Sequence, residues 1–541
     1  MAPATRTWNA WCTAFWCTTL VTVAPLFAGK FLPFVDLPEH VASIATMHDL
    51  AAPHSVASQY YDLAIARSPY VLYHAVGALL TSVAGSAEHA NLVLLALAGI
   101  ALPLSFRSLL RALGRDERLA IFAPMLFWNR ALLIGFLPFI ASIPLAFFAL
   151  GMVARQAQEP RRSRAIVLAV LAVVLFYVHL SSYIFFSVTA FFWSLLPSLR
   201  REAGRRLPDA IRRVVWMVPS GVTAMVWFVL GKMTVHGDSL TDADEIGSMG
   251  LVRALHALPL WTFDIWLSHV DEVCAGVWWG AFFVIAVTTL RRDMRREASP
   301  APWVQLYIPL ACAMLAYLLI PFRVGAGTML NVRLAPLIAL SALLPLELDA
   351  SRLNVRLLPF VAAASLVTSA WAGYEVWTYS HVDMAGFDAL LAKMKPGTSV
   401  MTLNFDASSP RRHWLGLFSG SYHRARGGGV ASYSFAELHH WPIHYVESVR
   451  PPRKPVPFFI LAPCVYRNRI DGAYFDYILV QGKDVDPFAD GPPGPVFRKV
   501  DETSRFVLFE KVKGENFPDW STDDEGPCVP HARVSKADAP E

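Results

Sequence analysis

Residues 137–153 read LPFIASIPLAFFALGMV, a run without a single charged side chain. A helix needs about 20 apolar residues to cross the hydrocarbon core of a bilayer, and this run comes close to that length. Similar runs occur at residues 11–29, 89–107, 119–134, 165–179, 181–198, 214–232, 274–291, 303–321, 331–347 and 357–378. The sequence therefore predicts a polytopic α-helical membrane protein with about eleven transmembrane helices.

The composition of the 541-residue chain excludes other classes of protein. Hydrophobic residues make up 55% of it and charged residues only 16%. Soluble globular domains have about 25% charged residues, so a soluble enzyme is excluded, and disordered or fibrous proteins are excluded by the same figures. The sequence contains no pattern typical of a nucleic-acid-binding module, and we expect no nucleic acid among its partners.

Charge divides the connections between the apolar runs into two groups. Arginine is concentrated in five of them, at residues 107–118, 155–164, 200–213, 291–296 and 352–356, whereas acidic connections lie between these. Arginine-rich loops stay in the cytoplasm, which places the N-terminus there and the chain in the cytoplasmic membrane. With an odd number of spans the C-terminus lies outside. Residues 70–84 are apolar but too short to span unaided, and they predict a re-entrant or interfacial helix.

The membrane domain is expected to cover residues 1–379, with a first outer loop at 31–88 that carries surface helices. After residue 380 the content of Gly, Pro, His and charged residues rises, and no further run is long enough to span. An extracytoplasmic α/β domain with a frayed tail is therefore predicted at 380–541. Its strand-like segments lie at residues 399–405, 458–461, 477–480 and 505–510.

Two of the six cysteines, Cys464 and Cys528, lie in this C-terminal domain. Outside the cytoplasm an even pair of cysteines is a candidate disulfide, and these two are the pair we single out. Two unrelated buried thiols remain the alternative.

The first outer loop begins Phe34-Val35-Asp36-Leu37-Pro38-Glu39-His40, directly after the first apolar run. Pro38 suits the first turn of a helix. The apolar residues that follow fall on one face of that helix, which can therefore lie along the membrane surface. From local sequence alone, Asp36 is the N-cap of this helix and Glu39 is a favourable charge in its first turn.

The same loop resembles a known family. An aspartate directly after the first membrane helix, followed by an amphipathic surface helix, is similar to the integral-membrane glycosyltransferases of the GT-C superfamily, among them the protein O-mannosyltransferases and the lipid A aminoarabinose transferases. The stretch Arg67-Ser68-Pro69-Tyr70-Val71-Leu72-Tyr73 and the apolar run after it resemble their Lys-Pro-Pro-Leu-Tyr-Tyr-like segment. The resemblance covers about residues 8–120. It departs from the family at Leu37-Pro38, which moves the second carboxylate to Glu39, and at Ser68.

The resemblance implies a membrane glycosyltransferase that takes a sugar from a polyprenyl phosphate and passes it, with inversion, to an acceptor on the outer side. By position, Asp36 is implied to be the general base, with Glu39 as the second carboxylate of the site. Arg67 stands where the family has lysine and is implied to bind the donor phosphate, which arginine can do through two parallel hydrogen bonds. The sugar and the acceptor are not implied.

Other residues expected near the outer side extend this candidate site. The arginines that can help to bind the phosphate are Arg130, Arg323 and Arg333, although snorkelling explains Arg333 equally well. The residues that can line the site are His40, Tyr70, Tyr73, His179 and Asp264. For His179 an ordinary buried histidine is the favoured interpretation.

Two groups of residues bear on a metal. A divalent cation can bind oxygen ligands in an acidic outer loop formed by Asp264, His269, Asp271 and Glu272, but a solvated loop is the favoured interpretation. In the histidine-rich run at 439–444, Pro442 breaks the helix that would align two histidines, so zinc is not expected. We therefore name no cofactor, and a divalent metal stays an open alternative.

Two functions of other classes remain as alternatives. One is a lipid or saccharide transporter or flippase, and the other is a non-catalytic membrane scaffold whose C-terminal domain binds an envelope partner. A transporter usually contains internal repeats, and the sequence has none that we detect. Polar residues gather at one side of the membrane, which favours surface chemistry. A scaffold has no need for Asp36 and Arg67 together.

Overall fold

The computed structural model describes most of the chain and divides it into two compact units. The first unit comprises Met1–Ala28 and Val93–Tyr374, and the second comprises Gly29–Leu92 and Glu375–Glu541. Each unit is therefore assembled from two separate segments of the chain. The described residues are 2–65, 68–199, 203–234, 246–293, 303–324, 327–348, 352–406, 409, 411, 414–438, 440–452, 466, 471–482 and 497–512.

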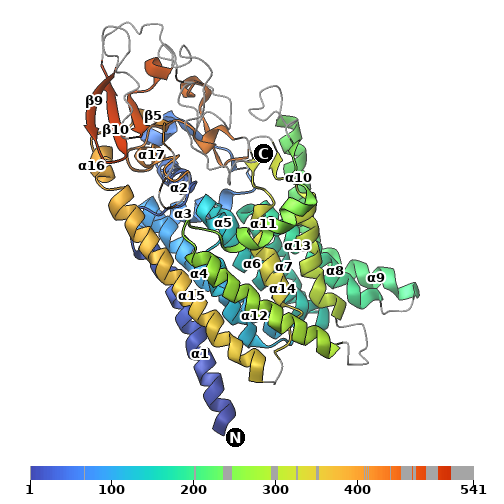
Figure 1. Cartoon of the computed structure of the whole chain (residues 1–541). Coiled ribbons are helices and arrows are strands. Elements are labelled where there is room, and N and C mark those ends of the chain that lie inside the picture. Colours follow the sequence, from blue (N-terminus) through green and yellow to red (C-terminus); the bar gives the residue numbers. More distant parts are fainter. Residues whose placement is uncertain are drawn as a thin grey trace. The chain divides into compact units, whose positions relative to one another are not determined.

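The first unit is helical (Figure 1). Its helices, of which α4 and α15 extend past the unit boundaries, are α1 (Ala2–Val23), η1 (Ala24–Phe27), α4 (Ala87–Ala112), α5 (Arg130–Ile134), α6 (Leu137–Gln158), α7 (Arg162–Val178), α8 (Leu180–Leu199), α9 (Ala203–Val214), η6 (Val215–Met217), α10 (Val218–Thr234), α11 (Leu251–Phe263), α12 (Val270–Asp293), α13 (Trp303–Leu319), η7 (Val332–Leu334), α14 (Ala335–Leu343) and α15 (Arg352–Thr378). Three short strands accompany them, β2 (Ile246–Gly247), β3 (Arg323–Val324) and β4 (Gly327–Thr328).

Seven helical segments in the described part of the chain are long and apolar enough to cross a membrane. They are Ala10–Phe27, Ala87–Ala112, Leu137–Gln158, Leu180–Leu199, Arg206–Leu230, Val270–Arg291 and Asn354–Asp383. Shorter apolar helices lie at Val71–Ala84, Val304–Leu319 and Val332–Ala342. The polytopic helical fold that the hydropathy predicts is confirmed.

Helix α6 packs against α7 and α8 in the first unit (Figure 1). The contact includes a hydrogen bond of 2.6 Å from the Ser142 hydroxyl to that of Ser182. A Cβ atom added at Gly151 would lie only 3.3 Å from the Cα atom of Leu109, so glycine permits the backbones of α6 and α4 to approach closely. Small residues are typical of such close helix contacts in membranes.

The segment 119–134, expected as one transmembrane helix, is not one. It forms the 3₁₀ helices η4 (Glu117–Phe122) and η5 (Pro124–Phe127), followed by α5. Pro124 lacks the backbone N–H that a continuing helix needs. The side chain of Asn129 accepts hydrogen bonds from the first N–H groups of α5, so a new helix begins there. Because residues 119–129 are buried, their apolar composition reflects packing inside the protein.

The second unit contains a five-stranded mixed sheet in the order β6-β5-β8-β10-β9 (Figure 1). Strand β5 runs parallel to β6 and β8, whereas β10 is antiparallel to β8 and β9. Every residue of β5 and β8 is buried, as is typical of strands covered on both faces. The α/β character predicted for the C-terminal domain is confirmed. The strands are β5 (Ser399–Asn404), β6 (Val430–Ala431), β8 (Tyr477–Gln481), β9 (Phe497–Glu502) and β10 (Phe506–Lys511).

The first loop packs with the C-terminal segment in this second unit. Strand β1 (Tyr61–Leu63) pairs antiparallel with β7 (Ile443–Tyr445). Helix α2 (Leu37–Leu50) packs against α3 (Val71–Ala84) and α17 (Ser421–Gly427). The sequence instead groups loop 31–88 with the membrane helices. The remaining helices of the unit are η2 (Val56–Gln59), η8 (Tyr379–Asp383), α16 (Phe387–Leu391), η9 (Phe435–Glu437) and η10 (Glu447–Val449).

Helix α2 differs from the one-sided surface helix that its sequence predicts. All of its residues from Leu37 to Met47 are buried. It packs against α3, and the C-terminal segment supplies hydrogen-bond partners for the side chains of Glu39 and Ser43. A polar face that is buried in this way must be hydrogen-bonded, since an unpaired polar group loses its hydration without compensation.

Candidate active site

Asp36 stands at the N-terminal end of α2, in the N-cap position. Its backbone is helical (φ −85°, ψ −2°), and its side chain makes no capping hydrogen bond. N-cap residues usually have an extended backbone, which lets the side chain turn back to accept a bond from the first turn. The interpretation of Asp36 as a side-chain cap is therefore not supported, although the helix begins where that interpretation places it.

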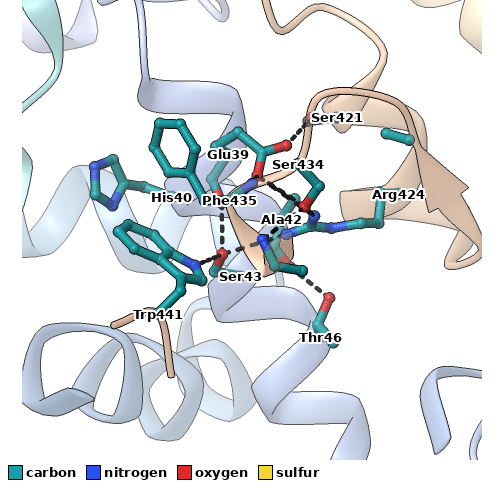
Figure 2. Close-up of polar contacts among 12 residues, drawn as sticks. Glu39, His40, Ala42, Ser43, Thr46, Ser421, Arg424, Ser434, Phe435 and Trp441 are labelled. Carbon is teal, nitrogen blue, oxygen red and sulfur yellow. Dashed lines mark hydrogen bonds and ion pairs between the residues drawn. The ribbon is translucent and has the colours of Figure 1, made fainter. Parts of the chain in front are cut away.

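Glu39, one turn further along α2, is completely buried. One carboxylate oxygen, Oε1, accepts a hydrogen bond from the hydroxyl of Ser421 in α17. The other, Oε2, accepts bonds from the Ser434 hydroxyl at 3.1 Å and from the backbone N–H of Phe435 at 2.7 Å. The structure thus surrounds Glu39 with donors from a part of the chain nearly four hundred residues away (Figure 2).

Arg424 of α17 supplies the positive charge that Glu39 faces. Its Nη1 atom lies 3.4 Å from Oε2 of Glu39 and also donates to Ser434. Its Nη2 atom donates to the Ser43 hydroxyl at 3.2 Å. Desolvation by burial acts most strongly and lowers the pKa of this guanidinium, but the Glu39 carboxylate together with Tyr61 and Tyr445 outweighs it, and the pKa is raised. Arg424 is therefore charged, and the pair is a buried ion pair.

Ser43 extends the network by one more turn of α2. Its hydroxyl donates to the backbone carbonyl of Glu39 at 2.8 Å and accepts a bond from the indole N–H of Trp441 at 2.9 Å. Glu39 and Ser43 are four residues apart and so lie on the same face of the helix. That face carries the polar contacts to the C-terminal segment (Figure 2).

The side chain of His40 contacts α3 on a neighbouring side of α2. Its Nδ1 atom lies 3.0 Å from Nε2 of His74, and Nδ1 of His74 lies 3.0 Å from the backbone carbonyl of Tyr70. Because a carbonyl can only accept, we infer that His74 carries its proton on Nδ1 and accepts at Nε2 from Nδ1–H of His40. Burial lowers the pKa of His74 to about 4, so this neutral arrangement holds at neutral pH.

The protonation of His74 gives a testable pH dependence. A histidine whose pKa falls from 6.5 to about 4 on folding binds more protons when unfolded. Stability is therefore expected to fall as the pH drops from about 6.5 towards 4, by at most roughly 3 kcal/mol from this group. Thermal unfolding of the wild type and of His74→Asn, compared across this range, should show a shallower dependence in the variant. Parallel curves would contradict the assignment.

The two tyrosines expected to line the site lie beside these histidines. The Tyr73 hydroxyl donates to Oδ1 of Asn91 at 2.7 Å, and its ring packs edge-on against His40. Tyr70 precedes α3 and is half-buried, with its ring 5.5 Å from that of His440. The structure thus brings His40, Tyr70 and Tyr73 together around His74. Arg67, Cys464 and Cys528 lie outside the described residues.

The other candidate residues belong to the first unit. Nη1 of Arg130 forms an ion pair of 2.6 Å with Oδ2 of Asp264. The guanidinium of Arg333 lies 3.9 Å above the ring of Phe136, and Arg323 pairs through β3 with β2 and β4. His179 is buried at the end of α7, where its Nδ1 accepts a bond from the N–H of Ser181, as an ordinary buried histidine would.

The other members of the acidic cluster at Asp264 form hydrogen bonds or ion pairs with residues near them in the sequence. Oδ2 of Asp271 accepts bonds from the backbone N–H groups of Ile265 and Trp266, and His269 pairs with Glu272 on the surface. Within the described residues, no three His, Cys, Asp or Glu side chains are arranged to hold a metal ion.

Sequence reasoning missed the residues that surround Glu39. These are Ser421 and Arg424 of α17, together with Ser434 and Trp441 from the loops on either side of η9. They carry no spacing signal, because they contact α2 only in the folded chain. The one available signal lies in the helix itself. Glu39 and Ser43 are four residues apart and share one helix face, and a buried polar face needs hydrogen-bond partners.

Comparison with known proteins identifies the fold. No protein-family model and no curated protein sequence matches the chain. The structure is similar to that of ArnT from Cupriavidus metallidurans bound to undecaprenyl phosphate, with a TM-score of 0.56 and 13% identity over 93% of this chain and 98% of that one. It is also similar to the arabinofuranosyltransferase AftD from Mycobacteria, with a TM-score of 0.53 and 15% identity over 94% of this chain but only 40% of AftD. The chain is an integral membrane protein with the fold of the GT-C glycosyltransferases.

Proposed function

We propose that the chain is a membrane glycosyltransferase that moves a sugar from a polyprenyl phosphate to an acceptor of the cell envelope on the extracytoplasmic side. The observation that carries this proposal is the likeness of nearly the whole chain to ArnT, whose structure holds undecaprenyl phosphate. The aspartate at the start of the first helix of the first loop supports it from the sequence.

In the proposed reaction Asp36 is the general base. Its carboxylate takes the proton of an acceptor hydroxyl while the acceptor oxygen attacks the anomeric carbon of the sugar. The bond from that carbon to the phosphate oxygen breaks, and the polyprenyl phosphate leaves with the electron pair, so the configuration is inverted. Glu39 is completely buried, and we therefore assign the base role to Asp36 alone, by its position in the sequence.

Cations must stabilise the charge that develops on the leaving phosphate. By its position in the sequence we assign Arg67 to this task, and Arg130, Arg323 and Arg333 are further candidates. Of these, Arg130 already forms an ion pair with Asp264, so a phosphate bound by Arg130 would share the guanidinium with that carboxylate. His40, Tyr70, Tyr73 and His179 remain candidates for lining the site.

A donor assay tests the proposal. The full chain in lipid nanodiscs is incubated with a panel of radiolabelled undecaprenyl-phosphate sugars and a cell-envelope extract as the source of acceptor. We expect one donor to release undecaprenyl phosphate and to label the envelope fraction. If no donor is cleaved but the labelled lipid crosses the bilayer of proteoliposomes, the chain is a flippase and the proposal is wrong.

A further inference from the structure

We propose that the buried Glu39–Arg424 pair is a positioning device, which fixes the first turn of α2 and with it the Asp36 carboxylate. The inference rests on the proposed function, because it assigns the pair a purpose in the reaction of Asp36. Glu39 and Arg424 are then positioning residues that act through Asp36 and do not touch the substrate.

The burial of the pair supports a role at a distance. The side chains of Glu39 and Arg424 are 0% and 1% exposed. Both oxygens of Glu39 and both Nη atoms of Arg424 have partners within the protein. A substrate could reach them only by displacing these bonds, so neither side chain is placed to bind one directly.

An ion pair is a poor choice if the only purpose is to attach α2 to its neighbours. Two buried charges lose their hydration, and well-packed apolar side chains of similar volume often hold a structure equally well. Hydrogen bonds to a carboxylate and a guanidinium differ from apolar contacts because they are directional. What this pair adds is therefore a defined orientation of the helix.

The geometry of the contacts fixes both the rotation and the axial position of α2. Glu39 and Ser43 are one turn apart on one face, and Arg424 reaches the side chains of both (Figure 2). On a neighbouring side, the bond from His40 to His74 ties the same turn to α3. A helix held from two directions cannot turn about its axis without breaking one of these contacts.

Asp36 is placed to benefit from this restraint. It directly precedes α2, three residues before Glu39 and four before His40, and so lies one turn from both contacts. A general base must stay within hydrogen-bond reach of the proton it removes, and a displacement of about 1 Å can reduce the rate about 100-fold.

The test replaces both charges at once, in Glu39→Met/Arg424→Met. Both partners become apolar, so no buried charge is left unpaired and the fold is expected to survive. We expect kcat for sugar transfer to fall about 10- to 100-fold with the KM for donor unchanged. The backbone amides of residues 37–43 should also exchange hydrogen faster than in the wild type.

A matched control uses an exposed ion pair that joins the segment before α2 to the C-terminal segment. Nζ of Lys30 lies 2.6 Å from Oδ2 of Asp388, with side chains 54% and 44% exposed. Lys30→Met/Asp388→Met makes the same chemical change at an exposed pair outside α2. Arg426 of α17, which also pairs with Asp388, keeps its second partner Glu88. We expect this control variant to leave both kcat and the exchange of residues 37–43 at their wild-type values.

Each outcome bears on the inference separately from the proposed function. Wild-type kcat together with wild-type exchange in the Glu39→Met/Arg424→Met variant would overturn the positioning role. If the wild type cleaves no donor, the proposed function fails, and unchanged exchange in the variant would then overturn the inference on its own. Should the double variant not fold, Ser421→Ala/Ser434→Ala keeps both charges, removes two bonds to Glu39 and is judged by the same two measurements.

Discussion

Replacement of Asp36 by asparagine is expected to lower the rate of sugar transfer about 10²–10⁴-fold, the range typical for the loss of a general base. Asparagine keeps the shape of the side chain but cannot take up the proton of the acceptor. The helix should begin unchanged, because the Asp36 side chain makes no capping bond to it. The measurement is the release of undecaprenyl phosphate from the donor identified for the wild type, together with donor binding, which should be retained.

Asp49→Asn is the matched control for this prediction. It makes the same change at the other end of α2, on an exposed residue in the last turn of the helix. Its transfer rate should equal that of the wild type. An Asp36→Asn enzyme as active as Asp49→Asn would refute the assignment of the base. Arg67→Ala should have a different effect from Asp36→Asn. It should weaken donor binding, because it removes the positive charge proposed to bind the donor phosphate.

The membrane fold could be predicted from the sequence because the bilayer imposes a length on apolar segments. The prediction failed at 119–134, where Pro124 and Asn129 divide the run into short helices. Apolar runs of this length occur both in spans and in buried protein segments, and hydropathy does not separate them. Proline alone does not separate them, since Pro103 and Pro144 lie inside the candidate spans α4 and α6. The local signal of a break here is the capping side chain of Asn129.

The helix that follows Asp36 could also be predicted, but its environment could not. The start of α2 after Asp36 follows from Pro38 and the apolar pattern. The burial of its polar face depends on Arg424 and Trp441, which lie nearly four hundred residues further along the chain. A glutamate in a first helical turn is ordinarily a favourable surface charge, and local sequence does not reveal a distant partner.

The buried pair gives the second large prediction, an effect on stability. Removing one charge leaves the other buried without its partner, which typically destabilises a protein by about 3–5 kcal/mol. We expect Glu39→Met and Arg424→Met to lower the unfolding temperature by roughly 10 °C each, as measured by thermal unfolding in detergent. The double variant should recover most of this loss. A loss in the double variant equal to the sum of the two single losses would show that the two charges do not interact.

The two single variants should differ in their response to pH. In Arg424→Met the buried carboxyl of Glu39 can become neutral by binding a proton, whereas in Glu39→Met the guanidinium of Arg424 stays charged at any accessible pH. The folded Arg424→Met protein then binds more protons than the unfolded chain, so its stability relative to the wild type should rise as the pH falls. No such recovery is expected for Glu39→Met. A parallel response of both variants would mean that the carboxylate reaches water once Arg424 is gone, and that the site is less enclosed than its contacts indicate.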